Sequence, residues 1–207
     1  MNSLCGILNR KTAVLAAGDF PAPGGLARRL LESAERVICC DSAADAYWEE
    51  FVREPDAVVG DCDSVRRAYR NLVRVAEQDT NDLAKAISYC RSRGWRDLVI
   101  LGALGKRDDH ALGNVFRALA EQVPVVTDHG VFHPVFGCAR FSAVPGSGIS
   151  VFAPDRETRM TSQGLEWPLD GVRFDNLYVA TLNRAPSGEF SVRSDRPVFV
   201  YIEGSAV

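Results

Sequence analysis

Short runs of β-branched and apolar residues alternate with helical patterns along the first half of this chain. The expected strands cover residues 12–17, 37–40, 57–59, 73–76, 98–101 and 125–127. The expected helices cover residues 25–35, 42–53, 81–93 and 109–121. Strands that alternate with helices in this way are typical of βαβ units, so we predict an α/β fold with a mostly parallel sheet.

The pattern changes after about residue 130, where Gly, Pro and Ser separate short segments of alternating polarity. Expected strands here include residues 148–152, 177–181, 190–192 and 198–202, and no helical pattern is present. We therefore predict two domains, an α/β domain over residues 1–135 and a C-terminal all-β sandwich over residues 136–207.

The composition is that of an ordinary globular chain, with 207 residues of which 46% are hydrophobic and 25% charged. No apolar stretch reaches the ~18 residues of a membrane-spanning helix, and the N-terminus lacks the pattern of a secretory signal. The six cysteines form no C-x-x-C pair, which favours reduced thiols. We expect a cytoplasmic protein without a membrane partner. The net charge of −3 offers no basic surface, so we also expect no nucleic-acid partner.

Acidic residues recur directly after the predicted strands. The positions that follow four of these strands are Asp41, Asp61 with Asp63, Asp79 with Asp82, and Asp108 with Asp109. Ligands of open α/β sheets collect at the carboxyl ends of the strands, so these carboxylates should share one rim. Any single Asp could instead be a helix N-cap, which stabilises a helix by about 1 kcal/mol.

The segment GDCDS, residues 60–64, is less well explained by helix capping, because it holds two carboxylates and a hydroxyl. Asp61 and Asp63 repel each other unless a cation offsets their charge. Mg²⁺ is bound by carboxylates together with the phosphates of a substrate. The sequence therefore predicts a magnesium site here, although D-x-D also occurs in metal-dependent glycosyltransferases and phosphatases.

A second constellation is LGALGKRDDHALGN, residues 101–114. Its glycines permit close approach of a phosphate, and Arg107 offers a fork of donors that fits phosphate oxygens. It is neither a Walker A loop nor a Rossmann fingerprint. The position of His110 just inside a helix favours a hydrogen-bonded structural residue over a base, and His129 and His133 lack a third ligand for zinc.

Several motifs in order resemble the thiamine pyrophosphokinase family, also called thiamine diphosphokinase. They are CDSAADAY (40–47), GDCDS (60–64), QDTNDLAKAI (78–87) and LGALGKRDDHALGN (101–114). The segments GLEWPL (164–169) and TLNRAPSGEFSV (181–192) are also similar to the family, so the resemblance extends over nearly the whole chain.

The resemblance implies transfer of a diphosphoryl group from ATP to thiamine, with Mg²⁺ as cofactor, in a homodimer with active sites at the subunit interface. It implies an acidic catalytic cluster of Asp41, Asp61, Asp63 and Asp82, of which Asp61, Asp63 and Asp82 are the metal ligands. It further implies that the two substrates, ATP and thiamine, are held by Ser64, Gln78, Arg107, Asp109 and Asn183.

The sequence departs from the family pattern at Ser42 and Ala43, Asn81, Lys106 and Leu182. The change at Leu182 concerns the acceptor pocket, because the family usually has Ser there. We expect Trp167 and Tyr178 to pack in the core, and the alternative is that they form an apolar wall against thiamine. The alternative functions are a metal-dependent phosphatase or nucleotidyltransferase with the same acidic cluster, and a non-catalytic thiamine- or nucleotide-binding regulator.

Overall fold

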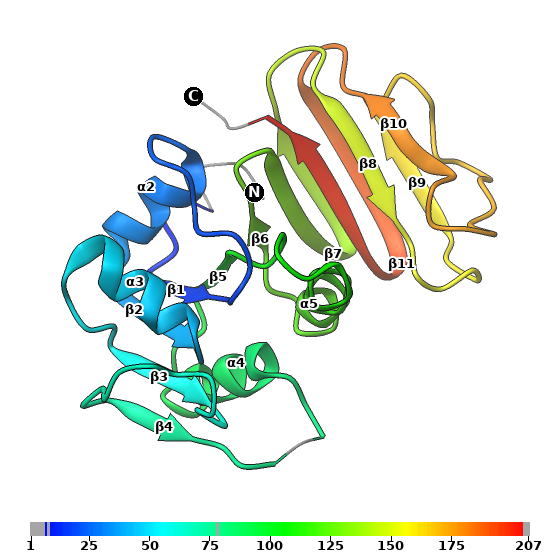
Figure 1. Cartoon of the computed structure of the whole chain (residues 1–207). Helices are drawn as coiled ribbons and strands as arrows, with labels where there is room; N and C mark the ends of the chain where they lie inside the picture. The colour runs from blue at the N-terminus through cyan, green and yellow to red at the C-terminus, as the bar shows by residue number, and fades with distance from the viewer. Residues whose placement is uncertain (1–6, 8, 78, 205–207) are drawn as a thin grey trace. The chain divides into compact units, whose positions relative to one another are not determined.

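The chain divides into two compact units in a computed structural model that describes residues 7, 9–77 and 79–204 (Figure 1). The α/β unit consists of residues 10–121 and 125–127. The β unit includes residues 122–124 and the described residues from Asp128 onward. The predicted succession of an α/β part and an all-β part is confirmed.

The α/β unit is built on a parallel sheet with the strand order β6-β5-β1-β2-β3-β4. Its strands are β1 (Thr12–Leu15), β2 (Arg36–Cys40), β3 (Ala57–Gly60), β4 (Leu72–Arg74), β5 (Leu98–Leu101) and β6 (Val125–Val126). Its helices are α2 (Leu26–Ser33), α3 (Ala43–Phe51), α4 (Asp82–Ser92) and α5 (Asp108–Ala120). The order reverses between β1 and β5, and a crevice at the carboxyl ends of strands is expected at such a switch point.

The predicted helices and strands of this unit all form, with ends that move by a few residues. Strands β1, β3 and β5 are buried along their whole length. Such strands have continuous apolar sequences because helices cover both faces of a parallel sheet. Helix α2 buries Leu26, Leu30 and Leu31 on one face, which is the amphipathic pattern of a helix that packs on a sheet.

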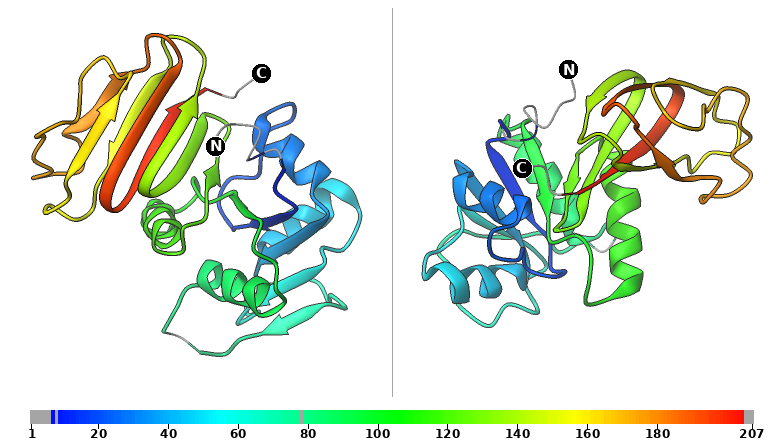
Figure 2. Two further views of the ribbon diagram at one scale, coloured as in Figure 1. Left: turned by 180° about the vertical axis from the view of Figure 1, so that it is seen from behind. Right: turned by 90° about the horizontal axis from the view of Figure 1, so that it is seen from above.

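The β unit is antiparallel and centres on two long strands. It contains β7 (Gly130–Ser142), β8 (Gly148–Phe152), β9 (Met160–Gln163), β10 (Ala180–Arg184) and β11 (Glu189–Glu203). Strand β11 pairs with β7 on both sides of a register shift between Ser194 and Val198. The part of β11 before this shift pairs with β9, and the part after the shift pairs with β8. Strand β10 pairs with the other edge of β8. Figure 2 shows the long pair from two further sides.

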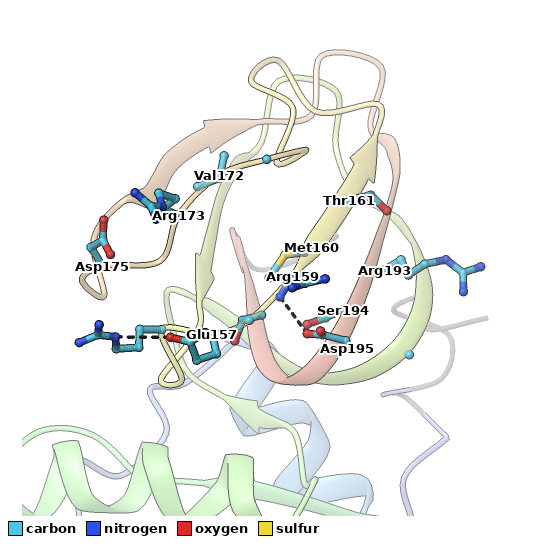
Figure 3. A pocket seen from close by; sticks show the side chains of 14 residues that line it. Glu157, Arg159, Met160, Thr161, Val172, Arg173, Asp175, Arg193, Ser194 and Asp195 are labelled. Atoms are coloured by element: carbon cyan, nitrogen blue, oxygen red, sulfur yellow. Dashed lines mark hydrogen bonds and ion pairs between the residues drawn. The ribbon is translucent and has the colours of Figure 1, made fainter.

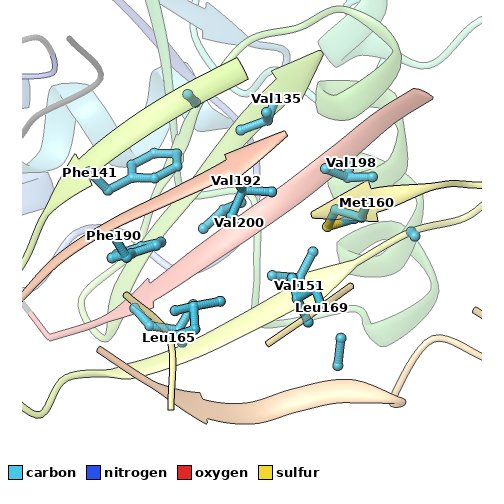
Figure 4. Close-up of a cluster of buried hydrophobic side chains, with 14 of the residues drawn as sticks. Val135, Phe141, Val151, Met160, Leu165, Leu169, Phe190, Val192, Val198 and Val200 are labelled. Atoms are coloured by element: carbon cyan, nitrogen blue, oxygen red, sulfur yellow. The ribbon is translucent and has the colours of Figure 1, made fainter. Parts of the chain in front are cut away.

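One apolar cluster fills the β unit and joins both halves of the long strands (Figure 4). Phe141 of β7 and Phe190 and Val192 of β11 lie on one side of the register shift, and Val198 and Val200 of β11 lie on the other. Both halves therefore contribute to a single core, as the two layers of a sandwich do.

Four details of the β unit differ from the sequence-based prediction, and one of them is the short strand β9, which was not predicted. Strand β7 was not predicted, because Pro134 and Gly137 interrupt its apolar alternation. The expected strands 190–192 and 198–202 are two parts of β11, joined across the register shift. The expected strand 177–181 lies further along, at Ala180–Arg184.

The expected domain boundary between residues 135 and 136 falls within β7. Within the described residues, no helix combines the length and apolar character needed to cross a membrane.

Candidate active site

The loop after β3 brings two carboxylates to the end of the parallel sheet. Cys62, between them, has a left-handed backbone with a φ of 61°, so the chain turns sharply from Asp61 to Asp63. The Asp63 amide donates to Asp61 Oδ1 at 3.4 Å, and Ser64 Oγ donates to Asp63 Oδ1 at 2.9 Å. These local bonds fold the D-x-D segment into a compact turn.

Asp41 follows the neighbouring strand β2 and joins the same group. Asp41, Asp61 and Asp63 can each offer a carboxylate oxygen, with these atoms all within 4.8 Å of one another. Asp41 also has a left-handed backbone, with a φ of 42°, which is uncommon for a residue other than Gly. The structure therefore brings together carboxylates from two adjacent strand ends.

The Asp41 carboxyl group is buried in an unfavourable environment. Its Oδ1 atom has no hydrogen-bond partner among the described residues. Burial raises the pKa of Asp41, and the negative charge of Asp82 raises it further. An unpaired buried oxygen beside two more carboxylates fits a hard divalent cation such as Mg²⁺, because that ion binds oxygen ligands and offsets their charge.

Asp82 lies beside this group as the first residue of α4. A β-carbon on Gly60 would be 3.1 Å from Asp41 Cβ and 3.2 Å from Asp82 Oδ1. The absence of a side chain at Gly60 therefore leaves room for both residues. Lys85 Nζ donates to Asp82 Oδ1 at 3.2 Å, so this carboxylate has a partner within the protein.

The loops after β1 and β5 meet at the switch point of the sheet. The Gly18 amide donates to Gly102 O at 2.8 Å, and the Asp19 amide donates to Leu104 O at 2.7 Å. Gly105 has a φ of 82°, and a β-carbon there would be 1.9 Å from Asp19 Oδ2. The left-handed backbone favours glycine at this position, and a side chain there would displace the Asp19 carboxylate.

Arg107 and Asp109 form an exposed ion pair at the start of α5. Arg107 Nε donates to Asp109 Oδ1 at 3.1 Å, and its terminal nitrogen donates to Oδ2 at 2.5 Å. The hydrogen bonds from Arg107 lower the pKa of Asp109 to about 2. The guanidinium group is thus held by a carboxylate, an arrangement that a phosphate group can replace.

Most predicted site residues line one cavity of about 360 Å³. Its lining includes Asp41, Asp61, Asp63, Ser64, Asp82 and Arg107. A second cavity, of about 370 Å³, is lined by Asp109 and by Asn81 and Lys85 among others. The two cavities adjoin, because they share Ala17, Asp61, Asp82, His110 and Asn114. Asn114 also fixes the local structure, since it accepts from Asn81 and donates to Ala103 O.

Two predicted site residues line neither of these cavities within the part of the chain that the structure describes. Asn183 is in the β unit, where its side chain donates to Trp167 O at 2.7 Å and accepts from the Trp167 amide at 3.1 Å. Gln78 lies outside the described residues. Trp167 is 53% exposed and Tyr178 is also exposed, so neither belongs to the core.

Sequence reasoning assigned no role to Lys85 and Asp19, although the structure places both at the site. Lys85 stands among Leu83, Ala86 and Ile87 on a helix with a buried face, and a charged residue in such surroundings is a signal that could have identified it.

A larger cavity, of about 880 Å³, lies in the β unit and holds none of the predicted site residues (Figure 3). Its charged groups do not converge on one point, since Figure 3 shows Arg173 and Arg193 on opposite sides. The Arg159 amide donates to Asp195 Oδ1 at 2.8 Å. This cavity therefore lacks the concentrated charge of the site in the α/β unit.

Fold and site together define a protein with a parallel α/β unit, an acidic ligand site at the ends of its strands, and a following β unit. A family model described as the thiamin pyrophosphokinase catalytic domain matches residues 27–127. The model described as the substrate-binding domain of thiamin pyrophosphokinase matches residues 130–201. The chain therefore belongs to the thiamin pyrophosphokinase family, which is a family of enzymes, and the resemblance seen in the sequence is confirmed.

Individual relatives agree with this assignment. Thiamine pyrophosphokinase 1 of Arabidopsis thaliana is 28% identical, and the match covers 80% of this chain and 77% of the relative. The thiamin pyrophosphokinase from Candida albicans has a TM-score of 0.76 at 16% identity and covers 97% of this chain and 91% of its own. The Bacillus subtilis enzyme has a TM-score of 0.72 at 17% identity, with coverages of 95% and 100%. At these identities the structures establish the fold alone.

Proposed function

We propose that this chain transfers the terminal diphosphoryl group of ATP to the hydroxyl of thiamine, with Mg²⁺ as cofactor. The thiamine oxygen forms a bond to the β-phosphorus, the bond from that phosphorus to the α,β-bridging oxygen breaks, and AMP leaves. The hydroxyl proton is released. Family membership and the carboxylate cluster of the α/β unit are the observations that support this reaction.

The carboxylates are the part of the site that suits the metal. Asp41, Asp61 and Asp63 would hold Mg²⁺, with Asp82 beside them. Bound there, the ion would neutralise charge on the phosphate oxygens, which phosphoryl transfer requires. The sequence implied Asp61, Asp63 and Asp82 as ligands, and the close grouping of Asp41 supports its addition to that set.

Other side chains of the same cavity suit the anionic part of ATP. Arg107 would exchange Asp109 for phosphate oxygens, and Ser64 lines the same cavity with a hydroxyl. These groups bind and orient the triphosphate, and such positioning supplies much of the catalysis in phosphoryl transfer. Gln78 stays a proposed contact from the resemblance alone.

We propose that residues 1–135 bind nucleotide and metal and that residues 136–207 bind thiamine. Thiamine is a flat aromatic cation, and exposed aromatic rings suit such a ligand. Trp167 and Tyr178 are exposed, and Leu182 is 84% exposed with a left-handed φ of 62°. Asn183 fixes the backbone of Trp167, so its proposed contribution to thiamine binding is to place that ring.

The exposed apolar residues also support the proposal of a homodimer with active sites at the subunit interface. Large apolar side chains that face solvent are typical of interfaces and ligand sites.

The cysteines of the described residues are all free, which is typical of reducing compartments and supports a cytoplasmic location.

The test is incubation of the protein with ATP, Mg²⁺ and thiamine. The proposal requires AMP and thiamine diphosphate in equal amounts, and neither product when thiamine or Mg²⁺ is omitted. Inorganic phosphate or ADP without thiamine would instead indicate a phosphatase, and release of pyrophosphate would indicate a nucleotidyltransferase. Binding of both substrates without any product would indicate a regulator. Family membership does not favour either alternative.

A further inference from the structure

Lys85 is a buried lysine at the edge of the carboxylate site. It lies one turn after Asp82 in α4, and its side chain is only 3% exposed. A buried ammonium group is costly unless it is paired, because it loses its hydration. A lysine in this position therefore requires a partner that compensates its charge.

One partner accounts for only part of the hydrogen-bonding capacity of Lys85. Its Nζ atom donates to Asp82 Oδ1 at 3.2 Å, and no other acceptor is present among the described residues. An ammonium group has three donors. Lys85 also lines the cavity of about 370 Å³ that adjoins the carboxylate cavity. The unused donors are thus available to a ligand in that cavity.

The surroundings favour an anionic ligand. Asp61 and Asp82 line both cavities, and a cation bound to this cluster would bring the phosphates of a nucleotide to the same place. Charge-assisted hydrogen bonds from an ammonium to phosphate oxygens are among the stronger ones. Lys85 is the lysine of the second cavity, whereas Lys106 and Arg107 line the first.

We propose that Lys85 binds a nonbridging oxygen of the diphosphoryl group of ATP while Asp82 holds its ammonium group in place. This inference rests on the proposed function. It gives Lys85 a substrate contact, whereas a purely structural lysine would only neutralise Asp82. The two roles have different consequences for nucleotide binding in variants of both residues.

The experiment measures binding of α,β-methylene ATP with Mg²⁺ by calorimetry, since this analogue cannot transfer its diphosphoryl group. Lys85→Met keeps the apolar stem and removes the charge, so we expect about 10- to 100-fold weaker binding. Lys85→Arg should bind within about threefold of the wild type. Lys11→Met is the matched control, because Lys11 is exposed and pairs with Glu35, away from both cavities.

The double variant separates the two roles. If Lys85 acts only through Asp82, the pair Asp82→Asn and Lys85→Met binds the analogue as Asp82→Asn does alone, and the proposal is overturned. A phosphate contact instead lowers affinity by a further ~10-fold. Lys85→Gln is measured in parallel in case the Met variant does not fold, and unchanged affinity in that variant also overturns the proposal.

A failure of the proposed function is distinguishable from a failure of this inference. Wild-type protein that releases no AMP from ATP and thiamine contradicts the function itself. Wild-type protein that is active, together with Lys85→Met that binds the analogue normally, contradicts only the role of Lys85.

Discussion

Gly60 and Asp82 lie so close together that a β-carbon on Gly60 would be 3.2 Å from Asp82 Oδ1. The backbone of Gly60 is not left-handed, so alanine is compatible with its conformation. We expect Gly60→Ala to push Asp82 out of place and to lower turnover roughly 10- to 100-fold, because small misplacements are costly in catalysis. Steady-state AMP release measures this effect. Unchanged turnover in a folded variant would show that Asp82 tolerates displacement.

Asp63 is the most exposed of the three clustered aspartates Asp41, Asp61 and Asp63. Asp63→Asn should leave the fold intact and lower turnover at least ~100-fold, because it removes a charge from the proposed metal site. The measurement is AMP release at saturating ATP, with thermal unfolding as the check on folding. Asp97→Asn, an exposed aspartate that lines neither cavity, is the matched control. Normal turnover of folded Asp63→Asn would remove Asp63 from the mechanism.

Arg107 is expected to act on ATP affinity. Arg107→Ala should weaken ATP binding about 10- to 100-fold, since a charge-assisted bond to phosphate is lost. The affinity ratio to wild type should stay constant from about pH 5 to about pH 9. The reason is that Asp109, whose pKa Arg107 lowers to about 2, keeps its charge above that value and loses it only below. A ratio that varies within this range, or unchanged ATP affinity, would contradict the assignment.

The parallel sheet and its acidic rim could be predicted from the sequence because they depend on local order. Apolar runs mark the buried strands, and the residue after each strand must lie at the same edge of a parallel sheet. Asp41, Asp61, Asp63 and Asp82 line one cavity for this reason. The order of strands and acidic residues along the chain was sufficient to predict that these carboxylates lie together.

Other features could not be predicted, because they depend on distant contacts. The apolar neighbours of Lys85 in α4 signal that it is buried, but its pairing with Asp82 is visible only in the structure. The role of Asn183 depends on its bonds to Trp167, which is 16 residues away and in another segment. Strand β11 continues past Arg196 and Pro197 only because β7 pairs with it on both sides of the register shift. None of these contacts leaves a periodic pattern in the sequence.

The exposed ring of Trp167 leads to a prediction about thiamine. Trp167→Ala should raise the KM for thiamine about 10-fold and leave the KM for ATP unchanged, because the ring is proposed to contact only the aromatic cation. Initial rates at varied thiamine and fixed ATP give the first value. Phe136→Ala is the matched control, since Phe136 is another exposed aromatic residue of the β unit. An equal change in both KM values would argue against a direct contact with thiamine.

Asp45 offers a test of stability in the α/β unit. Asp45 is buried in α3. Its carboxylate accepts hydrogen bonds from Tyr69 Oη and from the Arg66 backbone amide, each at 2.8 Å. Asp45→Asn removes the charge that these donors stabilise, and we expect a loss of about 2 kcal/mol in the free energy of unfolding. Glu49→Gln is the control, because Glu49 pairs with the same Arg66 at the surface and should contribute at most about 0.5 kcal/mol.

The contribution of Asp45 to the free energy of unfolding should depend on pH. Burial acts to raise the pKa of Asp45, but the hydrogen bonds from Arg66 and Tyr69 outweigh it and hold the pKa below its usual value. The stabilising contribution of Asp45 is therefore complete above the unfolded-state pKa of about 3.9 and is lost as the pH falls through the lower folded-state value. Urea unfolding of wild type and Asp45→Asn should give a constant difference from about pH 5 to about pH 8 that shrinks below about pH 4. A difference that grows on acidification would mean that burial, not the hydrogen bonds, controls this carboxylate.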